Sequence, residues 1–502
     1  MIKKEYEELK SFVYNNKEVI LIGLVFLIIT FGYAVTMFTL GVSTETSVFN
    51  EASGSARWVA QSRFSTGILK KIFSTNQILP FRNSFLAVIM IFIVSIYSCK
   101  VLNKMSDNSK KNNKILNIVL TVLFITMPIS VHYMYYLTYS FEIGIGMFVC
   151  ILVADFFNKG IVLEKDKKYT ILGIILLTIG IGVYQSFVPF FILIELACIF
   201  IYFNNNNLKL KNKLIIIGKC ILYLMAALLL FVLISKIFLI FITEEKYTEG
   251  FFSWGKYDTK QILNNLFKYF KDIYLNDSIY GCYIIKPTII IGILIALYYI
   301  IIRKKWLEGL IIFSIMFTPM ILPICVGTAM PYRTQQTIML MIPIVWYLLC
   351  YTINSKKINN VIVVIVILIS IRQTMYVNKL FYSDYLRYQN DLNLSRKISN
   401  RIYDLDIENI ENYPVVYLGK KETELIPNLI RQELIGYSIY EWDNGNYKRM
   451  QHFMTLTTSK FKLATEDDLN KAKEIGKGMP NWPSKGSVAL KENMIIVKLS
   501  EY

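Results

Sequence analysis

Long runs of apolar residues, separated by short charged segments, occupy most of this sequence. The clearest run extends from Val19 to Leu40 and contains no charged residue. A helix needs about 20 mostly apolar residues to cross the hydrocarbon core of a bilayer. Because such runs recur up to residue 377, we expect residues 1–377 to form a polytopic bundle of membrane-spanning α-helices.

The composition argues against an ordinary soluble protein. Of the 502 residues, 54% are hydrophobic and 18% are charged, whereas roughly a quarter of the residues in a soluble domain are charged. The formal net charge of +18 would point to nucleic acid in a soluble chain. Here the basic residues gather in clusters between apolar runs, which is typical of membrane topology. We therefore predict that the protein is embedded in a lipid bilayer and does not bind nucleic acid.

The apolar runs and the positive clusters together predict eleven spans. The run Tyr169–Phe203 would be about 52 Å long as one helix, and Tyr184 to Ser186 interrupt it. Lysine clusters flank this run on both sides, and the positive-inside rule places both clusters in the cytoplasm, so the run crosses twice. The other nine runs give one span each: Val19–Leu40, Asn83–Cys99, Ile115–Val131, Leu137–Phe157, Leu214–Ile242, Ile284–Ile302, Leu307–Cys325, Thr334–Tyr351 and Asn359–Val377.

This count sets the sidedness of the remaining segments. With the N-terminus inside, two long loops, residues 41–82 and 243–283, fall outside, and so does the tail, residues 378–502. The tail mixes charged and aromatic residues and contains strand-like runs at Pro414–Leu418 and Met494–Leu499. We expect it to form a small α/β extracytoplasmic domain.

Acidic and basic residues follow one another in the first outside loop. Glu45 and Glu51 come after the first span, and Arg57 and Arg63 come next. A carboxylate can take a proton from a sugar hydroxyl, and an arginine can hold a lipid phosphate through paired hydrogen bonds. The loop is therefore a candidate catalytic site, and the simpler alternative is a solvated loop with surface charges.

Three residues in other segments are further candidates. Glu142 lies at the outer edge of the fourth span, where an isolated charge is costly and a catalytic role would explain it. Arg333 is the only basic residue of its short outside loop, and it either binds a phosphate or anchors the loop at the headgroups. Trp254 either stacks on an acceptor sugar or belongs to an ordinary interfacial aromatic belt.

The common metal and nucleotide motifs are absent from the sequence. It has two histidines, no H-E-x-x-H pattern, no Walker A loop and no cysteine pair. A divalent cation could bridge a carboxylate and a phosphate, but two glutamates are not a metal-site signature. We therefore assign no metal ligands.

Three segments carry a family resemblance. Residues 60–64, Ala-Gln-Ser-Arg-Phe, are similar to a Gln-Gly-Arg-Trp segment, with Ser62 and Phe64 replacing Gly and Trp. Residues 183–187 resemble a Tyr-Gln turn, and residues 436–443, Gly-Tyr-Ser-Ile-Tyr-Glu-Trp-Asp, resemble an extracytoplasmic tail. The three patterns that these segments resemble are those of the Gtr-type, GtrII-like glucosyltransferase family. Its members are polytopic bacterial enzymes that decorate surface polysaccharides such as O-antigen.

The resemblance implies a GT-C type fold and a site that includes Arg63, Tyr184, Gln185 and the acids upstream of Arg63. It further implies that a sugar, glucose above all, moves from a polyprenyl-phosphate donor such as undecaprenyl-phosphate glucose to a surface glycan. Transfer would take place on the outer face of the cytoplasmic membrane, and a companion flippase and a donor synthase would supply the donor.

The mechanism that we expect is a single displacement with inversion, in which Glu45 or Glu51 acts as general base and Arg63 and Arg333 stabilise the departing phosphate. The alternative functions are a lipid-linked glycan flippase or transporter and a surface-glycan polymerase. A transporter would need polar residues along a path through many spans, and a polymerase would not explain the folded tail.

Overall fold

The computed structural model describes residues 2–36, 39, 41, 56–76, 79–106, 113–241, 252–276, 281–422 and 429–502. Two compact units make up these residues. The larger unit contains most of the described residues up to Val377, and the smaller unit contains those from Asn378 onward.

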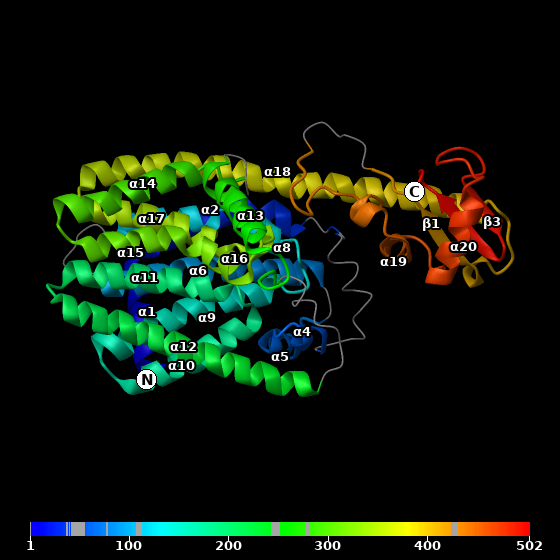
Figure 1. Cartoon of the computed structure of the whole chain (residues 1–502). Helices are drawn as coiled ribbons and strands as arrows, with labels where there is room; N and C mark the ends of the chain where they lie inside the picture. Colours follow the sequence, from blue (N-terminus) through cyan, green and yellow to red (C-terminus); the bar gives the residue numbers. More distant parts are fainter. Residues whose placement is uncertain are drawn as a thin grey trace. The chain divides into compact units, whose positions relative to one another are not determined.

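The larger unit is a bundle of helices (Figure 1). Its main helices are α2 (Lys17–Thr36), α6 (Pro80–Met105), α7 (Asn113–Ile125), α9 (Ser140–Asn158), α10 (Lys167–Val183), α11 (Phe187–Asn205), α12 (Leu210–Ile240), α14 (Ile285–Leu297), α15 (Trp306–Phe317), α17 (Gln336–Ile353) and the start of α18 (Lys356–Tyr403). Shorter or more polar helices complete it: α1 (Ile2–Asn15), α4 (Ala56–Ala60), α5 (Phe64–Ile72), α8 (Ser130–Met134), α13 (Thr259–Leu275) and α16 (Ile321–Val326). Two π-helical turns, Lys159–Leu163 and Tyr298–Ile302, extend α9 and α14.

Several helices have the length and composition of membrane spans. In the described part of the chain, eight helices are long and apolar enough to cross a bilayer, and a ninth is added when α1 and α2, which meet at 78°, count as one broken span. This agrees with the predicted polytopic fold. The predicted spans over α7 and α10 fall on helices of 13 and 17 residues, and the count of eleven stays a prediction.

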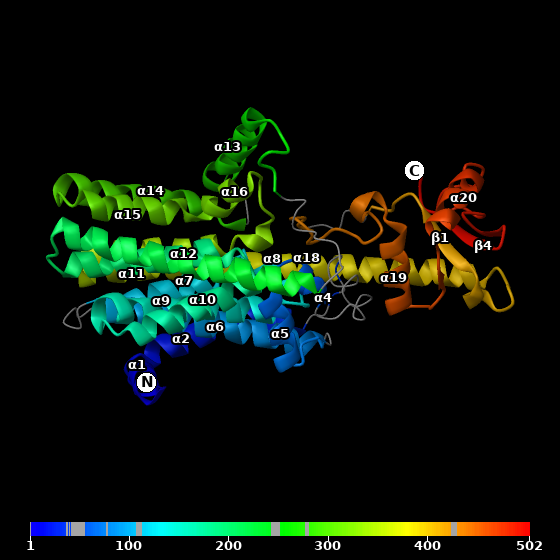
Figure 2. The same cartoon turned by 60° about the horizontal axis from the view of Figure 1, so that its bottom comes forward.

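The helices differ sharply in how much of their surface other helices cover. In the most apolar stretch of α17, 83% of the residues are buried inside the protein, whereas the corresponding value for α12 is 11%. The helix α12 runs along the lower edge of the bundle in Figure 1 and across its near face in Figure 2. An uncovered face of leucine and isoleucine side chains is unfavourable in water and favourable in lipid. We therefore treat α12 as a lipid-facing helix.

The smaller unit is built on a mixed four-stranded sheet with strand order β2-β1-β4-β3. The strands are β1 (Pro414–Leu418), β2 (Lys462–Leu463), β3 (Val488–Lys491) and β4 (Met494–Lys498), and β1 pairs in parallel with β2 and β4 while β3 and β4 are antiparallel. The two strand-like runs of the sequence thus coincide with β1 and β4. That this unit lies outside the cell stays a prediction.

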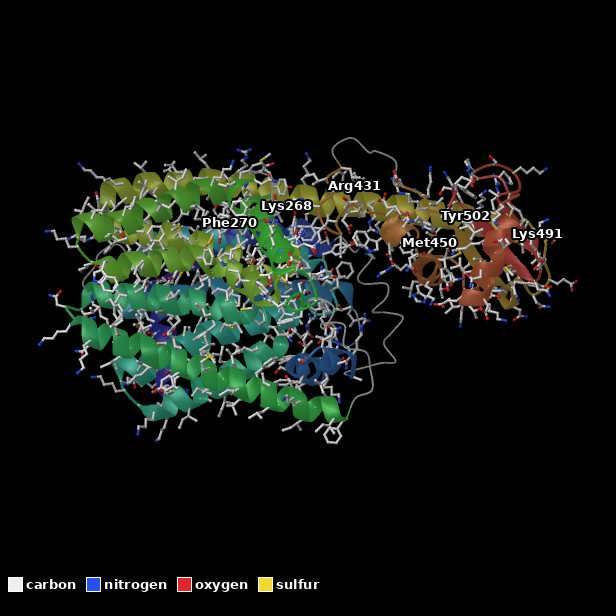
Figure 3. The ribbon with its side chains drawn as sticks, viewed as in Figure 1. Lys268, Phe270, Arg431, Met450, Lys491 and Tyr502 are labelled. Atoms are coloured by element: carbon white, nitrogen blue, oxygen red, sulfur yellow. The ribbon has the colours of Figure 1, made fainter. Side chains whose placement is uncertain are left out.

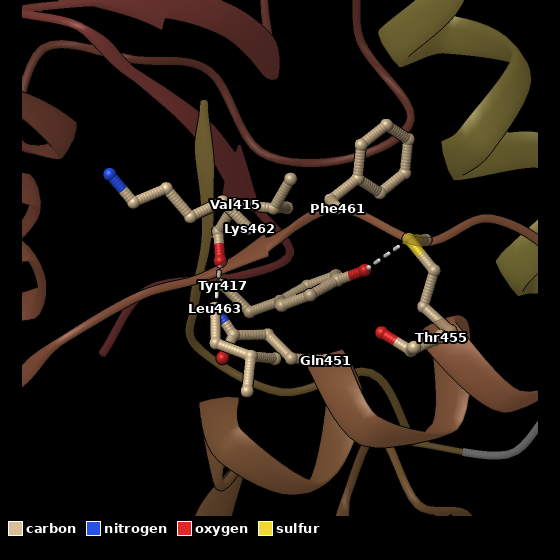
Figure 4. A pocket seen from close by; sticks show the side chains of 8 residues that line it. Val415, Tyr417, Gln451, Thr455, Phe461, Lys462 and Leu463 are labelled. Carbon is tan, nitrogen blue, oxygen red and sulfur yellow. Dashed lines mark hydrogen bonds between the residues drawn. The ribbon is translucent and has the colours of Figure 1, made fainter. Parts of the chain in front are cut away.

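Two helices cover opposite faces of this sheet. Tyr417 of β1 contacts Met454 of α19 (Tyr447–Thr457), whereas its neighbour Leu418 packs against Gly476 of α20 (Glu466–Gly476). Because successive strand residues point to opposite faces, the two helices lie on opposite sides of β1. The Tyr417 hydroxyl donates a hydrogen bond of 3.1 Å to the Met454 sulfur, and both residues line a crevice of about 10 Å³. Figure 4 shows Tyr417 in this crevice, with Gln451 and Phe461 around it. A crevice of that size holds at most one water molecule.

A buried ion-pair group holds the smaller unit together around α18. The Arg387 side chain is completely buried and pairs with Asp384 at 2.9 Å and with Asp391 at 3.1 Å. Asp391 also accepts hydrogen bonds from the Ser438 hydroxyl and from the backbone N–H of Ile439. The segment at residues 436–442 is therefore fixed to α18 through Asp391.

We expect Arg387→Met to destabilise the smaller unit by about 3–5 kcal/mol, because it leaves two buried carboxylates without their cation. Urea-dependent proteolysis of the full-length chain, read at cleavage sites beyond residue 378, measures the effect. Arg396→Met is the matched control, since Arg396 is exposed on the same helix. Equal resistance of Arg387→Met and the wild type would contradict the expectation.

Candidate active site

The larger unit contains a cavity of about 300 Å³. The helices α5 and α16, which adjoin or carry several of its lining residues, lie toward the same end of the bundle (Figures 1 and 2). The volume of the cavity is within the range typical of small-molecule sites. Segments far apart in the sequence line it: Ser62, Arg63, Tyr184, Gln185, Ser186, Phe231, Phe252, Leu322, Val326, Met330, Pro331, Arg333 and Thr334.

Arg63 and Tyr184 form one side of the cavity. The guanidinium carbon of Arg63 lies 4.3 Å from the centre of the Tyr184 ring, so the charge rests on the aromatic face. The Arg63 Nε is buried and has no hydrogen-bond partner among the described residues. A buried donor of this kind favours an acceptor from a ligand.

The break between α10 and α11 positions this side. Gln185, in the break, donates from Nε2 to the carbonyl oxygens of Gln61 at 2.9 Å and Ser62 at 3.4 Å. Ser62 adopts a left-handed backbone (φ 57°), which turns the chain before Arg63. A second hydrogen bond, from Thr66 Oγ1 to the Val183 carbonyl at 2.9 Å, joins α5 to the end of α10. Arg63 is thus fixed by contacts on both sides of it along the chain.

Arg333 also lines the cavity, from the 3-10 turn Tyr332–Thr334. Its guanidinium carbon lies 5.1 Å from the centre of the Tyr136 ring. Gln336 donates to the Arg333 carbonyl and accepts a hydrogen bond of 2.9 Å from the Ser186 hydroxyl. The turn that carries Arg333 is therefore tied to the same helix break that carries Gln185.

A row of aromatic rings connects the two arginines. The Tyr139 ring centre is 5.2 Å from that of Tyr136, under Arg333, and 6.3 Å from that of Tyr184, under Arg63. The negative faces of these rings offset part of the cost of holding two cations at a partly apolar site.

The described residues that line the cavity include two arginines and no acid. Most of the other lining side chains are apolar. Phe231 comes from the lipid-facing helix α12, and Phe252 comes from the segment before α13. Two guanidinium groups beside an apolar wall make a site for an anion that carries a hydrophobic group.

The glucosyl transferase GtrII family model matches residues 32–353. The chain belongs to this family. No curated protein and no solved structure matches the chain. The family membership confirms the resemblance drawn from the sequence, and every residue that lines the GtrII cavity lies within the matched range. Residues 354–502, which include nearly all of the smaller unit, lie outside it.

Four of the predicted site residues, Arg63, Tyr184, Gln185 and Arg333, come together at this cavity. Two other predictions, Glu45 and Glu51, lie outside the described residues, so their role as general base stays a prediction. Sequence reasoning missed Ser186, which directly follows the Tyr-Gln pair, and the apolar lining residues, for which the sequence gives no distinguishing signal.

Three predicted site residues, Arg57, Trp254 and Glu142, lie elsewhere in the larger unit. Arg57 is in α4 and does not line the cavity. Trp254 donates from Nε1 to the Ile324 carbonyl at 2.8 Å and packs beside Gly327. It thereby holds its segment on α16, while its neighbour Phe252 reaches the cavity.

Glu142 is buried at the start of α9, outside the cavity lining. Its carboxylate lies 3.7 Å from the Lys70 ammonium and accepts a hydrogen bond from the Thr75 hydroxyl. Lys70 also donates to the Thr138 carbonyl. Burial lowers the pKa of Lys70, although Glu142 opposes that effect. These contacts connect α5 to the start of α9. A catalytic role for Glu142 stays a prediction.

One group of three carboxylates in the described residues lies close enough to share a metal ion, at the other end of α9 from Glu142. It consists of Glu5, Glu8 and Asp155. Lysines form ion pairs with these carboxylates: Lys104 lies 2.8 Å from Glu8, and Lys100 lies 3.1 Å from Asp155. Ammonium groups at these distances balance the carboxylates and do not favour a divalent cation there.

Gly182 allows α5 to approach α10 closely, and we expect Gly182→Ala to lower stability by about 1–3 kcal/mol. An added Cβ would lie 2.6 Å from both the Phe64 ring and the Ser65 hydroxyl. The thermal unfolding midpoint of the purified chain measures the effect. Gly180→Ala on the same helix is the control, since its Cβ would lie at an ordinary 3.4 Å from Val149. Equal midpoints for the two variants would refute the close approach.

Proposed function

We propose that this GtrII-family glucosyltransferase moves glucose from a polyprenyl-phosphate donor to a cell-surface polysaccharide on the outer face of the cytoplasmic membrane. The observation that carries the proposal is the meeting of Arg63 and Arg333, from distant segments, at one cavity without a described acid. A polyprenyl phosphate combines an anionic group with a long apolar chain. The arginine pair and the apolar wall match these two parts.

The place of α12 supports a lipid-linked donor over a soluble one. Phe231 of α12 lines the cavity, and most of that helix is not covered by protein. The Phe64 ring stacks on the rings of Phe231 and Phe238 at centroid distances of 6.0 and 5.5 Å. An apolar wall shared between the cavity and the lipid-facing helix gives a prenyl chain a surface on which to lie.

The chemistry that we propose is one displacement with inversion at the anomeric carbon. Glu45 or Glu51 takes the proton from an acceptor hydroxyl, whose oxygen forms the new bond to that carbon. The bond from the anomeric carbon to the donor phosphate oxygen breaks, and the polyprenyl phosphate leaves with the electron pair. Arg63 and Arg333 stabilise the charge that develops on the leaving phosphate.

The remaining partners follow from this donor. In the proposal, Tyr184 and Gln185 shape the sugar-binding side of the cavity. Gln185 also fixes the turn before Arg63. A donor synthase would make the polyprenyl-phosphate glucose, and a companion flippase would deliver it to the outer leaflet. Because Arg333 lines the same cavity as Arg63, a phosphate-binding role is favoured over a headgroup anchor.

Arg63→Ala and Arg333→Ala are each expected to lower glucosyl transfer by about 100-fold, since each removes one preorganised donor to the leaving phosphate. The measurement is transfer of labelled glucose from polyprenyl-phosphate glucose to envelope polymer by membranes containing the protein. Arg303→Ala is the matched control, because Arg303 also lies over a tyrosine, Tyr298, at 5.5 Å but does not line the cavity.

Two results would contradict this proposal. Full activity of both cavity variants would remove the arginines from the reaction. An inactive wild type, tested with other sugars and with donor and acceptor verified as present, would favour the lipid-linked glycan flippase instead.

The general base is tested separately by Glu45→Gln and Glu51→Gln. The variant at the true base is expected to lose at least about 100-fold in kcat, because the acceptor hydroxyl keeps its proton. Membrane insertion, measured by the amount of protein in the membrane fraction, should not change. If both variants transfer glucose at the wild-type rate, the base lies elsewhere and Glu142→Gln is the next variant to measure.

A further inference from the structure

A second cleft, of about 270 Å³, lies in the smaller unit and outside the residues that the family model matches. Its lining residues come from the segment after β1 and from the region before α19: Lys420, Glu422, Arg431, Tyr437, Glu441, Trp442 and Asp443. Arg431 is labelled in Figure 3. Nothing in the proposed transfer chemistry uses this cleft.

Two aromatic rings form the apolar part of the cleft. The ring centres of Tyr437 and Trp442 are 5.8 Å apart at an interplanar angle of 67°, and both side chains are half-buried. The Arg431 guanidinium carbon lies 5.2 Å from the Tyr437 ring centre. Trp442 also packs against the hydrophobic core of the unit, which holds its ring in place.

The charges in the cleft are largely paired with one another. Lys420 lies 3.0 Å from Glu422, and Arg431 lies 3.5 Å from Glu441. Glu441 also accepts a hydrogen bond of 2.7 Å from the backbone N–H of Ser438. Since the cations already face carboxylates, the cleft is poorly suited to a polyanion. It offers several hydrogen-bonding groups beside aromatic surface, which suits a ligand rich in hydroxyl groups.

The backbone at one edge of the cleft adopts an uncommon conformation. Asp443, Asn444 and Gly445 all have left-handed φ angles, of 54°, 52° and 86°. A side chain at Gly445 would collide with the carbonyl of Gly419, so the two segments that line the cleft are packed backbone to backbone. Residues other than glycine in the left-handed region cost stability and concentrate at ligand-binding sites.

We propose that this cleft binds the acceptor glycan. The apolar face of a sugar ring packs on Trp442 and Tyr437, and the sugar hydroxyls hydrogen-bond to the Glu441 and Asp443 carboxylates and to Arg431. The inference rests on the proposed function, because it assigns the acceptor of that reaction. A polymer held on the same chain as the catalytic cavity meets the donor at a raised effective concentration.

Binding of the polymer tests the inference directly. The probe is the surface polysaccharide purified from the envelope of cells that make this protein, released from lipid and labelled with a fluorophore. The full-length chain in detergent is titrated without donor. Trp442→Ala is expected to bind about tenfold more weakly than the wild type. Trp482→Ala is the matched control, because Trp482 also packs on the core of this unit and also has an arginine, Arg401, at its ring. It should bind like the wild type, since Trp482 does not line the cleft.

Kinetics separate a failure of this inference from a failure of the proposed function. Trp442→Ala is expected to raise KM for the polymer about tenfold without lowering kcat, whereas Arg63→Ala loses transfer and still binds polymer. Wild-type binding by Trp442→Ala, or binding that 0.5 M salt abolishes in every variant, would overturn the glycan assignment. Specific binding without transfer by the wild type would overturn the proposed reaction and leave the cleft as a glycan-binding site.

Discussion

The hydrogen bonds from Gln185 to the Gln61 and Ser62 carbonyls are the constraint on which the cavity depends. They join a break between two helices to the turn that precedes Arg63. Ser186, next in the chain, bonds to Gln336, which in turn bonds to the Arg333 carbonyl. One short interruption in a 35-residue apolar run therefore positions both arginines through hydrogen bonds.

The tyrosines under the arginines help to explain how two like charges share one cavity although none of the described residues that line it is acidic. Each guanidinium group rests on a ring face, and a third ring, Tyr139, connects the two. The rings offset part of the desolvation cost but do not neutralise the charges. An anion in this cavity would therefore be favourable, which is the property that the proposed leaving phosphate requires.

The sequence predicts the helices better than their contacts. Apolar runs identify spans because lipid requires each span to satisfy its own backbone hydrogen bonds, and the interruption at Tyr184 to Ser186 already indicated two helices. Arg333 stood out as an exception to the charge bias of outside loops. Nothing in the sequence shows that Trp254 bonds to Ile324 while Phe252 faces the cavity, or that Glu142 pairs with Lys70. These contacts depend on which helix faces pack together. The sequence does not reveal the packing, because one apolar helix face resembles another.

The exposed helix α12 contributes Phe231 to the cavity wall, so a bilayer around the bundle would contact a helix that forms part of the donor site proposed above. The 31 residues of α12 extend about 46 Å as a helix, well beyond a hydrocarbon core of about 30 Å. Such a helix tilts, or thickens the bilayer around it, at a small cost per ångström of mismatch. Because protein covers little of the surface of α12, lipid chain length would act on the same helix that carries Phe231. Membrane thickness would then influence the proposed donor site, in addition to the side chains that line it.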